Sequence, residues 1–234
     1  MTTLQHDLYG YQDLGSLLSM MTGDEKHSAS AFSTLDVLWV LYDRVLRIDP
    51  RQPNDPDRDR FLLSKGHGPM AYYAVLAAKG FFPVADLATF GSTNRRFGNH
   101  PDAALLPGVE ISSGSLGHGL PISVGLTLGL RATGFHPSRV FVLIGDGELD
   151  EGSNHEAIQV AGRLRLDGLT AIVIDNASAT LGWPDGIAAR FSGEGWETCT
   201  VDGHDHHALE MAFQPPGDNR PRAVIARVTP KDVR

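Results

Sequence analysis

Two short apolar runs constrain the fold more than any other feature of the sequence. "RVFVLIG" at residues 139–145 and "LTAIVID" at 169–175 are rich in β-branched residues and almost continuously apolar, which is typical of strands covered on both faces. Between them, "SNHEAIQVAGRLRL" has apolar residues at helical spacing. A strand–helix–strand unit of roughly 30 residues with a right-handed crossover sets its strands parallel. The predicted fold class is therefore α/β.

Further runs extend this pattern along the chain. "TCTVDG" (198–203) and "RAVIARVT" (222–229) predict two more parallel strands, also covered on both faces. Helices on both faces of the sheet would make three layers. With 234 residues and 41% apolar content, one large domain spanning residues 1–234 is expected rather than two small ones. Helices are expected at 9–22, 34–46, 69–80, 115–133, 153–166, 187–196 and 205–213, with loops at 49–60 and 91–108.

Composition excludes several classes of protein. The formal charge of -8, without a block of lysine and arginine, argues against a nucleic-acid surface. No segment reaches the ~18 apolar residues of a membrane helix, and the first residues lack a signal-peptide pattern, so we expect a cytoplasmic protein. A single cysteine, Cys199, excludes an internal disulfide and cannot make a cysteine-based zinc site without several histidines beside it. We expect it to be a small buried residue.

Each of the first two strands ends at a polar residue that can bind a metal. Asp146 follows the first run, and Asn176 follows the second. The carboxyl ends of parallel strands meet at one edge of the sheet, where doubly wound sheets bind ligands. A carboxylate and an amide oxygen suit Mg²⁺ or Ca²⁺. With a helix N-terminus expected at Gly152, the pair predicts a metal ion that carries a diphosphate.

Other interpretations of this stretch are weaker. "GDG" alone is a common turn. An EF-hand is excluded because its sixth position would be Glu151 instead of glycine and its twelfth Ala157 instead of glutamate. No G-x-G-x-x-G opens the following helix, so the sequence lacks the dinucleotide fingerprint.

The GDG followed about thirty residues later by asparagine resembles the thiamine-diphosphate signature. Three ordered blocks, at 58–82, 98–131 and 145–176, resemble the transketolase family, and the similarity runs from about residue 9 to about 205. The resemblance implies the three-layer thiamine-diphosphate-binding fold. It also implies that the chain corresponds to the N-terminal, diphosphate-binding subunit of a split, two-component transketolase.

The resemblance assigns ligands at the cofactor site. It implies that Asp146 and Asn176 bind the metal through their side chains and Ser178 through its carbonyl. Gly114 and Gly147 would let the backbone approach the cofactor closely. The implied cofactor-binding set is Gly114, Ser115, Leu116, Gly145, Asp146, Gly147, Glu148, Asn176 and His67.

Three histidines match family positions that contact the diphosphate or the substrate hydroxyls: His67, His100 and His27. Taken singly, each is more often a surface or structural residue. The loop around His27 lacks glycines that the family has there. His118 replaces the family's usual glutamine and would hydrogen-bond at an interface or pack; His155 is expected to fill a helix, and His204, His206 and His207 to lie in a solvated turn.

Two acidic residues complete the implied catalytic set. Glu151 and Glu156 match a carboxylate network at the family's subunit interface, where clustered carboxylates share protons. Acidic residues near a helix N-terminus are also favoured by the helix dipole, and this explanation fits both residues equally well.

The resemblance also implies a partner. The family's glutamate that engages the aminopyrimidine ring lies on a following pyrimidine-binding domain, whereas this chain ends at Arg234. A separate subunit would supply it in an α2β2 heterotetramer, docking on the apolar helix at 115–133. The tail also lacks the family's "KGKG … HG" segment.

The implied reaction is transfer of a two-carbon ketol unit from a ketose to an aldehyde-type acceptor, in specialised metabolism. Two alternatives stay open: the alpha-type subunit of a thiamine-dependent 2-oxo acid decarboxylase or dehydrogenase, and a non-catalytic scaffold. Polar groups at His67 and His100 suit a hydroxylated substrate and favour the transferase.

Overall fold

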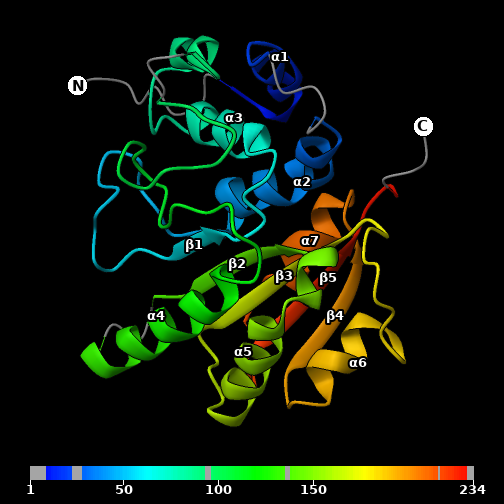
Figure 1. Cartoon of the computed structure of the whole chain (residues 1–234). Helices are drawn as coiled ribbons and strands as arrows, with labels where there is room; N and C mark the ends of the chain where they lie inside the picture. The colour runs from blue at the N-terminus through cyan, green and yellow to red at the C-terminus, as the bar shows by residue number, and fades with distance from the viewer. Residues whose placement is uncertain (1–8, 23–27, 93–95, 135–137, 216, 231–234) are drawn as a thin grey trace.

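The computed structural model describes residues 9–22, 28–92, 96–134, 138–215 and 217–230. His27 lies outside them. The described residues form a five-stranded parallel sheet in the order β1-β2-β3-β5-β4 (Figure 1), which confirms the predicted α/β class. The strands are β1 (Arg60–Leu63), β2 (Val140–Gly145), β3 (Leu169–Asp175), β4 (Glu197–Asp202) and β5 (Arg222–Arg227).

Helices cover both faces of the sheet (Figure 1). One layer contains α1 (Leu14–Ser19), α2 (Ser28–Val40), α3 (Met70–Ala78) and α7 (His206–Ala212), and the other contains α4 (Gly119–Thr133), α5 (Gly152–Arg163) and α6 (Gly186–Ser192). Short helical turns are η2 (Tyr11–Asp13), η4 (Leu41–Val45), η5 (Val84–Thr89) and η6 (Gly147–Asp150). No helix in the described part of the chain is both long and apolar enough to cross a membrane.

The central strands divide their side chains between two cores. In β2, Phe141 and Leu143 pack with α1–α3, whereas Val142 and Ile144 pack with α4 and α5. Successive side chains in a strand point to opposite faces. Because both faces are covered, both sets are apolar, and this explains the continuous apolar run in the sequence.

The structure corrects several expected elements. The strand β1 was not predicted, because four residues after a polar loop carry too little periodicity. The strand β4 lies at the sheet edge and is only partly buried, so the expectation that it is covered on both faces is wrong. The helix expected from residue 115 begins at Gly119, and residues 115–118 form a loop.

The amino end of the sheet is anchored by a buried carboxylate. Asp59 has a side chain that is 0% exposed and accepts the backbone N–H groups of Arg47 and Arg139, each at 2.9 Å. Its oxygens also lie 2.8 Å from Nη2 of Arg47 and 2.6 Å from Nη2 of Arg139. Burial alone would raise the pKa of Asp59, but hydrogen bonds from these two arginines outweigh it, so the pKa lies below its usual value.

Candidate functional site

Four loops converge at the opposite, carboxyl edge of the sheet. They comprise residues 64–68 after β1, 112–118 before α4, 145–152 around η6, and 175–181 after β3. Parallel strands place the ends of β1, β2 and β3 side by side. We refer to these segments as the carboxyl-edge loops, and every sequence-predicted site residue in the described chain except His100 and Glu156 lies on one of them.

The loops after β2 and β3 meet at Asp146. This residue is 2% exposed, and its Oδ2 accepts the backbone N–H groups of Ser178 at 2.6 Å and Ala179 at 3.1 Å. Its Oδ1 accepts the Ser178 hydroxyl at 2.5 Å and the Gly147 N–H at 2.9 Å. Two segments 32 residues apart are therefore joined through one carboxylate.

The oxygens around Asp146 fit a hard divalent cation. Asn176 is 7% exposed, and its Oδ1 is buried without a hydrogen-bond partner, a costly arrangement unless something else binds it. A Cβ on Gly147 would lie 3.5 Å from the Ser178 carbonyl oxygen, so this carbonyl lies next to the residue that follows Asp146. A carboxylate, an amide oxygen and a carbonyl are the donors that Mg²⁺ prefers. Cation binding would exchange hydrogen bonds at Asp146 for coordination.

Clusters of histidine, cysteine and acidic residues give no competing metal site. In the described residues, no three of these side chains are grouped so that they could hold a metal ion. The fit to a cation rests instead on the mixed set of carboxylate, amide and carbonyl.

Two of the predicted histidines lie together. The rings of His67 and His100 have centroids 5.1 Å apart at an interplanar angle of 74°. His100 is exposed, and His67 is half-buried. The hydroxyl of Tyr73 donates to the carbonyl of His100 at 2.9 Å and so fixes its loop. The pairing brings together residues from separate sequence blocks.

Glycines allow these loops to approach closely. A Cβ on Gly114 would lie 2.8 Å from Cδ2 of His100, and a Cβ on Gly66 would lie 2.9 Å from the backbone nitrogen of Gly114. Any larger residue would separate the loops. The resemblance pointed to Gly114, whereas the need for glycine at Gly66 emerges only from the packing.

Glu148 lies at the predicted edge, but its carboxylate faces the protein. It is 2% exposed and accepts hydrogen bonds from Ser64 Oγ, from Gly117 N at 3.0 Å and from Gly145 N at 3.3 Å. Burial raises the pKa of Glu148 above its usual value despite these donors. Ser64 was not among the predicted site residues, and its only signal was its place at the start of "SKGHG".

The two acidic residues near the start of α5 are exposed. Glu151 is the residue before the helix, and Glu156 lies in its second turn. On the neighbouring loop, Ser115 is exposed and Leu116 is half-buried. These four residues are therefore at least partly accessible at the surface.

His204 lies in an exposed turn, as predicted, whereas His206 begins α7 and is half-buried, so the solvated-turn prediction is wrong for His206. Asp36 of α2 binds both side chains, His204 Nδ1 at 2.9 Å and His206 Nε2 at 2.7 Å. The hydroxyl of Tyr11 donates to the same carboxylate at 2.6 Å. Burial raises the pKa of Tyr11 to about 12, and the hydrogen bond to Asp36 adds to the shift. The cluster connects α2 to the turn at His204 and to the first residue of α7.

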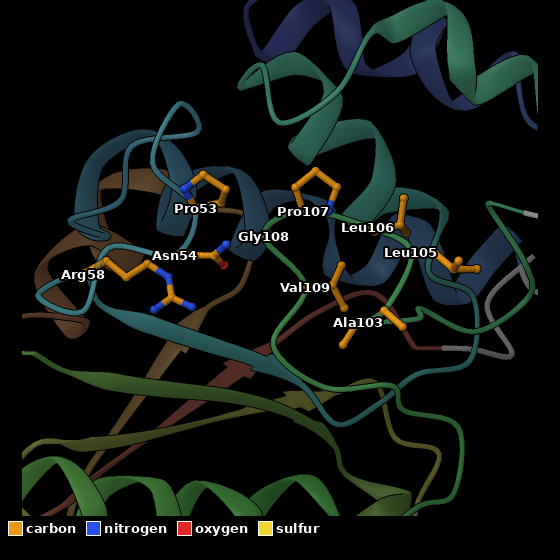
Figure 2. Close-up of a pocket in the computed structure, with 10 residues that line it drawn as sticks. Pro53, Asn54, Arg58, Ala103, Leu105, Leu106, Pro107, Gly108 and Val109 are labelled. Atoms are coloured by element: carbon orange, nitrogen blue, oxygen red, sulfur yellow. The ribbon is translucent and has the colours of Figure 1, made fainter.

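A separate cavity of about 290 Å³ is lined by two other segments of the chain (Figure 2). One wall contains Arg58, two residues before β1, whose Nη2 pairs with Glu110 at 2.6 Å. The lining residues come from 53–58 and 103–109. The sequence-predicted site residues do not line it.

Comparisons with known proteins identify the family. The model of "Transketolase, thiamine diphosphate binding domain" matches residues 19–229. The chain is 57% identical over 226 residues to "Ferredoxin fas2" of Rhodococcoides fascians, covering 97% of this chain and 74% of that protein. It is 37% identical over 194 residues to "6-deoxy-6-sulfo-D-fructose transketolase subunit SqwG" of a Clostridium species, covering 80% of this chain and 70% of that one.

Comparison with solved structures indicates the same family. A transketolase from Campylobacter jejuni superimposes with a TM-score of 0.76 at 26% identity, covering 97% of this chain but 38% of that chain. The similarity therefore includes the described sheet and its helices and about a third of a full transketolase. The chain belongs to the transketolase family, in which it corresponds to the thiamine-diphosphate-binding domain.

Proposed function

We propose that the chain is the N-terminal subunit of a split thiamine-diphosphate-dependent transketolase. It would transfer a two-carbon ketol unit from a ketose to an aldehyde-type acceptor. The observation that carries the proposal is the carboxyl edge, where Asp146 joins two loops beside the unpartnered oxygen of Asn176. The Clostridium relative supports the split organisation, because its name denotes one subunit of a transketolase and the match covers 70% of its length.

The chain's own residues suit the diphosphate half of a cofactor site. Asp146, Asn176 and the Ser178 carbonyl would hold Mg²⁺ or Ca²⁺, and Gly114 and Gly147 would leave room for the diphosphate. When bound, thiamine diphosphate supplies the nucleophilic carbon that adds to a ketose carbonyl. The helix N-terminus at Gly152 offers backbone N–H groups nearby.

His67 and His100 would bind and orient the substrate. Each ring nitrogen can donate or accept a hydrogen bond, and the pair lies beside Gly114, which would border the cofactor. Hydroxyl groups of a sugar fit such donors better than an apolar chain does. His27 is proposed for the same role from its sequence position alone.

A second subunit would complete the site with a pyrimidine-binding domain. On α4, Ile122 is 44% exposed, and Gly125 and Gly129 on the same side are also exposed. Such a face allows another helix to approach closely. With Glu151 and Glu156 exposed nearby, we propose that this surface forms the interface of an α2β2 heterotetramer.

The name of the Rhodococcoides fascians relative favours a second candidate function. "Ferredoxin" denotes an iron–sulfur protein, and such clusters are usually held by four cysteine thiolates. These 234 residues contain one cysteine, so they lack the ligands for a cluster. The alternative is a thiamine-dependent 2-oxo acid decarboxylase, which releases CO₂ and an aldehyde without electron transfer, or a dehydrogenase subunit, which releases CO₂ and passes two electrons, one at a time, to an iron–sulfur partner.

One set of measurements separates these functions. The chain, copurified with its partner from the native source, is titrated with thiamine diphosphate and Mg²⁺ by calorimetry and assayed for glycolaldehyde-unit transfer and for CO₂ release. Transfer without CO₂ supports the transketolase, CO₂ release with reduction of an iron–sulfur acceptor supports the dehydrogenase, and CO₂ release without reduction supports the decarboxylase.

Variants test the metal site directly. Asp146→Ala should abolish measurable cofactor binding, and the exposed Asp167→Ala serves as the control. If the wild-type complex does not bind the cofactor, or Asp146→Ala binds equally well, both enzyme proposals are wrong and a scaffold is favoured.

A further inference from the structure

We propose that Glu148 is a positioning residue that fixes three of the carboxyl-edge loops in the geometry required by the cofactor. The inference deepens the proposed function and rests on it. Glu148 would touch neither the metal nor the substrate, because its carboxylate is buried against loop backbone and Ser64.

The contacts of Glu148 join its own segment to two others. Its Oε1 accepts the hydroxyl of Ser64, at the end of β1, and the N–H of Gly117, before α4. Its Oε2 accepts the N–H of Gly145, at the end of β2. These partners are 84, 31 and 3 residues away in sequence. One side chain therefore sets the relative positions of loops that no local interaction could align.

The backbone at the start of α4 is hydrogen-bonded to two serine side chains. The Gly119 N–H donates to Ser64 Oγ at 2.9 Å, and the Ser153 hydroxyl donates to the Gly117 carbonyl at 2.5 Å. Gly117 has a φ of +83°, and a Cβ there would lie 2.6 Å from Cβ of Glu151. The turn therefore requires glycine, and its polar backbone groups are bound by side chains.

The direction of the hydrogen bonds explains why a carboxylate is needed. Ser64 accepts from Gly119, so its single hydroxyl proton is directed to Glu148. Two further donors, the N–H groups of Gly117 and Gly145, face the same side chain. An ionised carboxylate only accepts, whereas the amide of glutamine has an NH₂ group that must face one of these donors. Glutamine has nearly the same shape but cannot satisfy all three partners.

These loops carry the residues assigned to the cofactor and the substrate. Segment 64–68 contains His67, and segment 112–118 contains Gly114, which packs against His100. A loss of alignment should therefore weaken cofactor binding more than it slows turnover at saturating cofactor.

The variant Glu148→Gln tests this inference in the complex with the partner subunit. Calorimetry should show thiamine diphosphate binding weakened roughly tenfold, the loss expected for a hydrogen bond to a charged group, while kcat at saturating cofactor changes by less than about twofold. The matched control is Asp59→Asn, which alters a similarly buried carboxylate at the other end of the sheet. It should lower thermal stability and leave cofactor affinity unchanged.

Ser64→Ala provides an independent second variant. It removes one donor and keeps the carboxylate, so it should weaken binding in the same direction. Because the two residues share one hydrogen bond, the double variant should lose less affinity than the sum of the two single losses. Additive losses, or wild-type affinity in Glu148→Gln, would overturn the inference.

A measurement without cofactor separates this inference from the proposed function. Amide hydrogen exchange at Gly117, Gly145 or both should accelerate in Glu148→Gln, whereas exchange at Val142, within β2, stays unchanged. Failure of the wild type to bind thiamine diphosphate would refute the proposed function only. Unchanged exchange at both Gly117 and Gly145 would refute the role of Glu148 whatever the cofactor does.

Discussion

The two ends of the parallel sheet use buried carboxylates differently. At the amino end, Asp59 is bound by arginine side chains and backbone N–H groups, and its pKa is lowered. At the carboxyl end, Glu148 is bound by neutral donors, and burial raises its pKa. The first arrangement contains matched charges, whereas the second holds a carboxylate in place with neutral donors.

Buried polar atoms without a hydrogen-bond partner also distinguish the two ends of the sheet. Seven buried polar side-chain atoms of the described residues have no hydrogen-bond partner, and four of them, Ser113 Oγ, Asp150 Oδ1, Asn154 Oδ1 and Asn176 Oδ1, lie on or next to the carboxyl-edge loops. Near Asp59 at the amino end, the corresponding atom is Arg58 Nε. Each such atom costs about 1–3 kcal/mol in the unbound protein. A ligand that binds them recovers this cost. The amino end therefore stabilises the fold, and the carboxyl end is arranged for binding.

The largest effect on stability should come from a substitution at the amino end of the sheet. Asp59→Asn removes the charge that pairs with Arg47 and Arg139 and should lower the free energy of unfolding by about 3 kcal/mol. Denaturant unfolding measures it. Exposed Asp167→Asn, which pairs with Arg131 at the surface, should cost less than about 1 kcal/mol. Equal losses in the two variants would contradict the contrast between the ends.

The next largest effect should come from substitution of a closely packed glycine at the carboxyl end of the sheet. In Gly119→Ala, the new Cβ would lie 2.2 Å from Cβ of Ser64, so the loop must shift at a cost of about 1–3 kcal/mol. We expect weaker cofactor binding as well as lower stability. Gly125→Ala in the same helix meets nothing within 4 Å and should stabilise the chain by about 0.5–1 kcal/mol. Loss of stability in both variants would show that the helix, and not the contact with Ser64, is responsible.

The decrease in the free energy of unfolding at low pH should depend on Asp59. Its pKa in the folded chain lies below the ordinary value of 3.8, so its contribution is complete above pH 3.8 and is lost as the pH falls through the lower folded value. The difference in unfolding free energy between wild type and Asp59→Asn should therefore shrink in strong acid. Urea titrations from pH 6 downward measure it, and a constant difference would contradict the assigned ion pairing.

The smallest effect on the chain itself is expected on α4. Ile122→Asp changes an exposed side chain and should alter stability by less than about 0.5 kcal/mol, while weakening association with the partner subunit. Met211→Asp, 59% exposed on α7 in the other layer, is the matched control and should associate normally. Analytical ultracentrifugation distinguishes them, and equal behaviour would remove α4 from the proposed interface.

Local sequence pattern predicted much of the fold and part of the site. The apolar runs of β2 and β3 and the helix between them were predicted because burial on both faces leaves a continuous signal. Topology then brought the ends of these strands together, and Asp146 does contact the loop after Asn176. The strand β1 escaped prediction because its four residues are recognisable only beside β2.

By itself, the sequence determined the parallel α/β core and the position of the polar residues that end its strands, because strand and helix periods are local properties of the chain. Only the tertiary structure decided that Glu148 faces Ser64 and Gly117, and that Asp36 binds His204 from 168 residues away. Hydrogen bonds of this kind depend on the packed positions of distant segments. The spacing of residues along the chain therefore does not predict them.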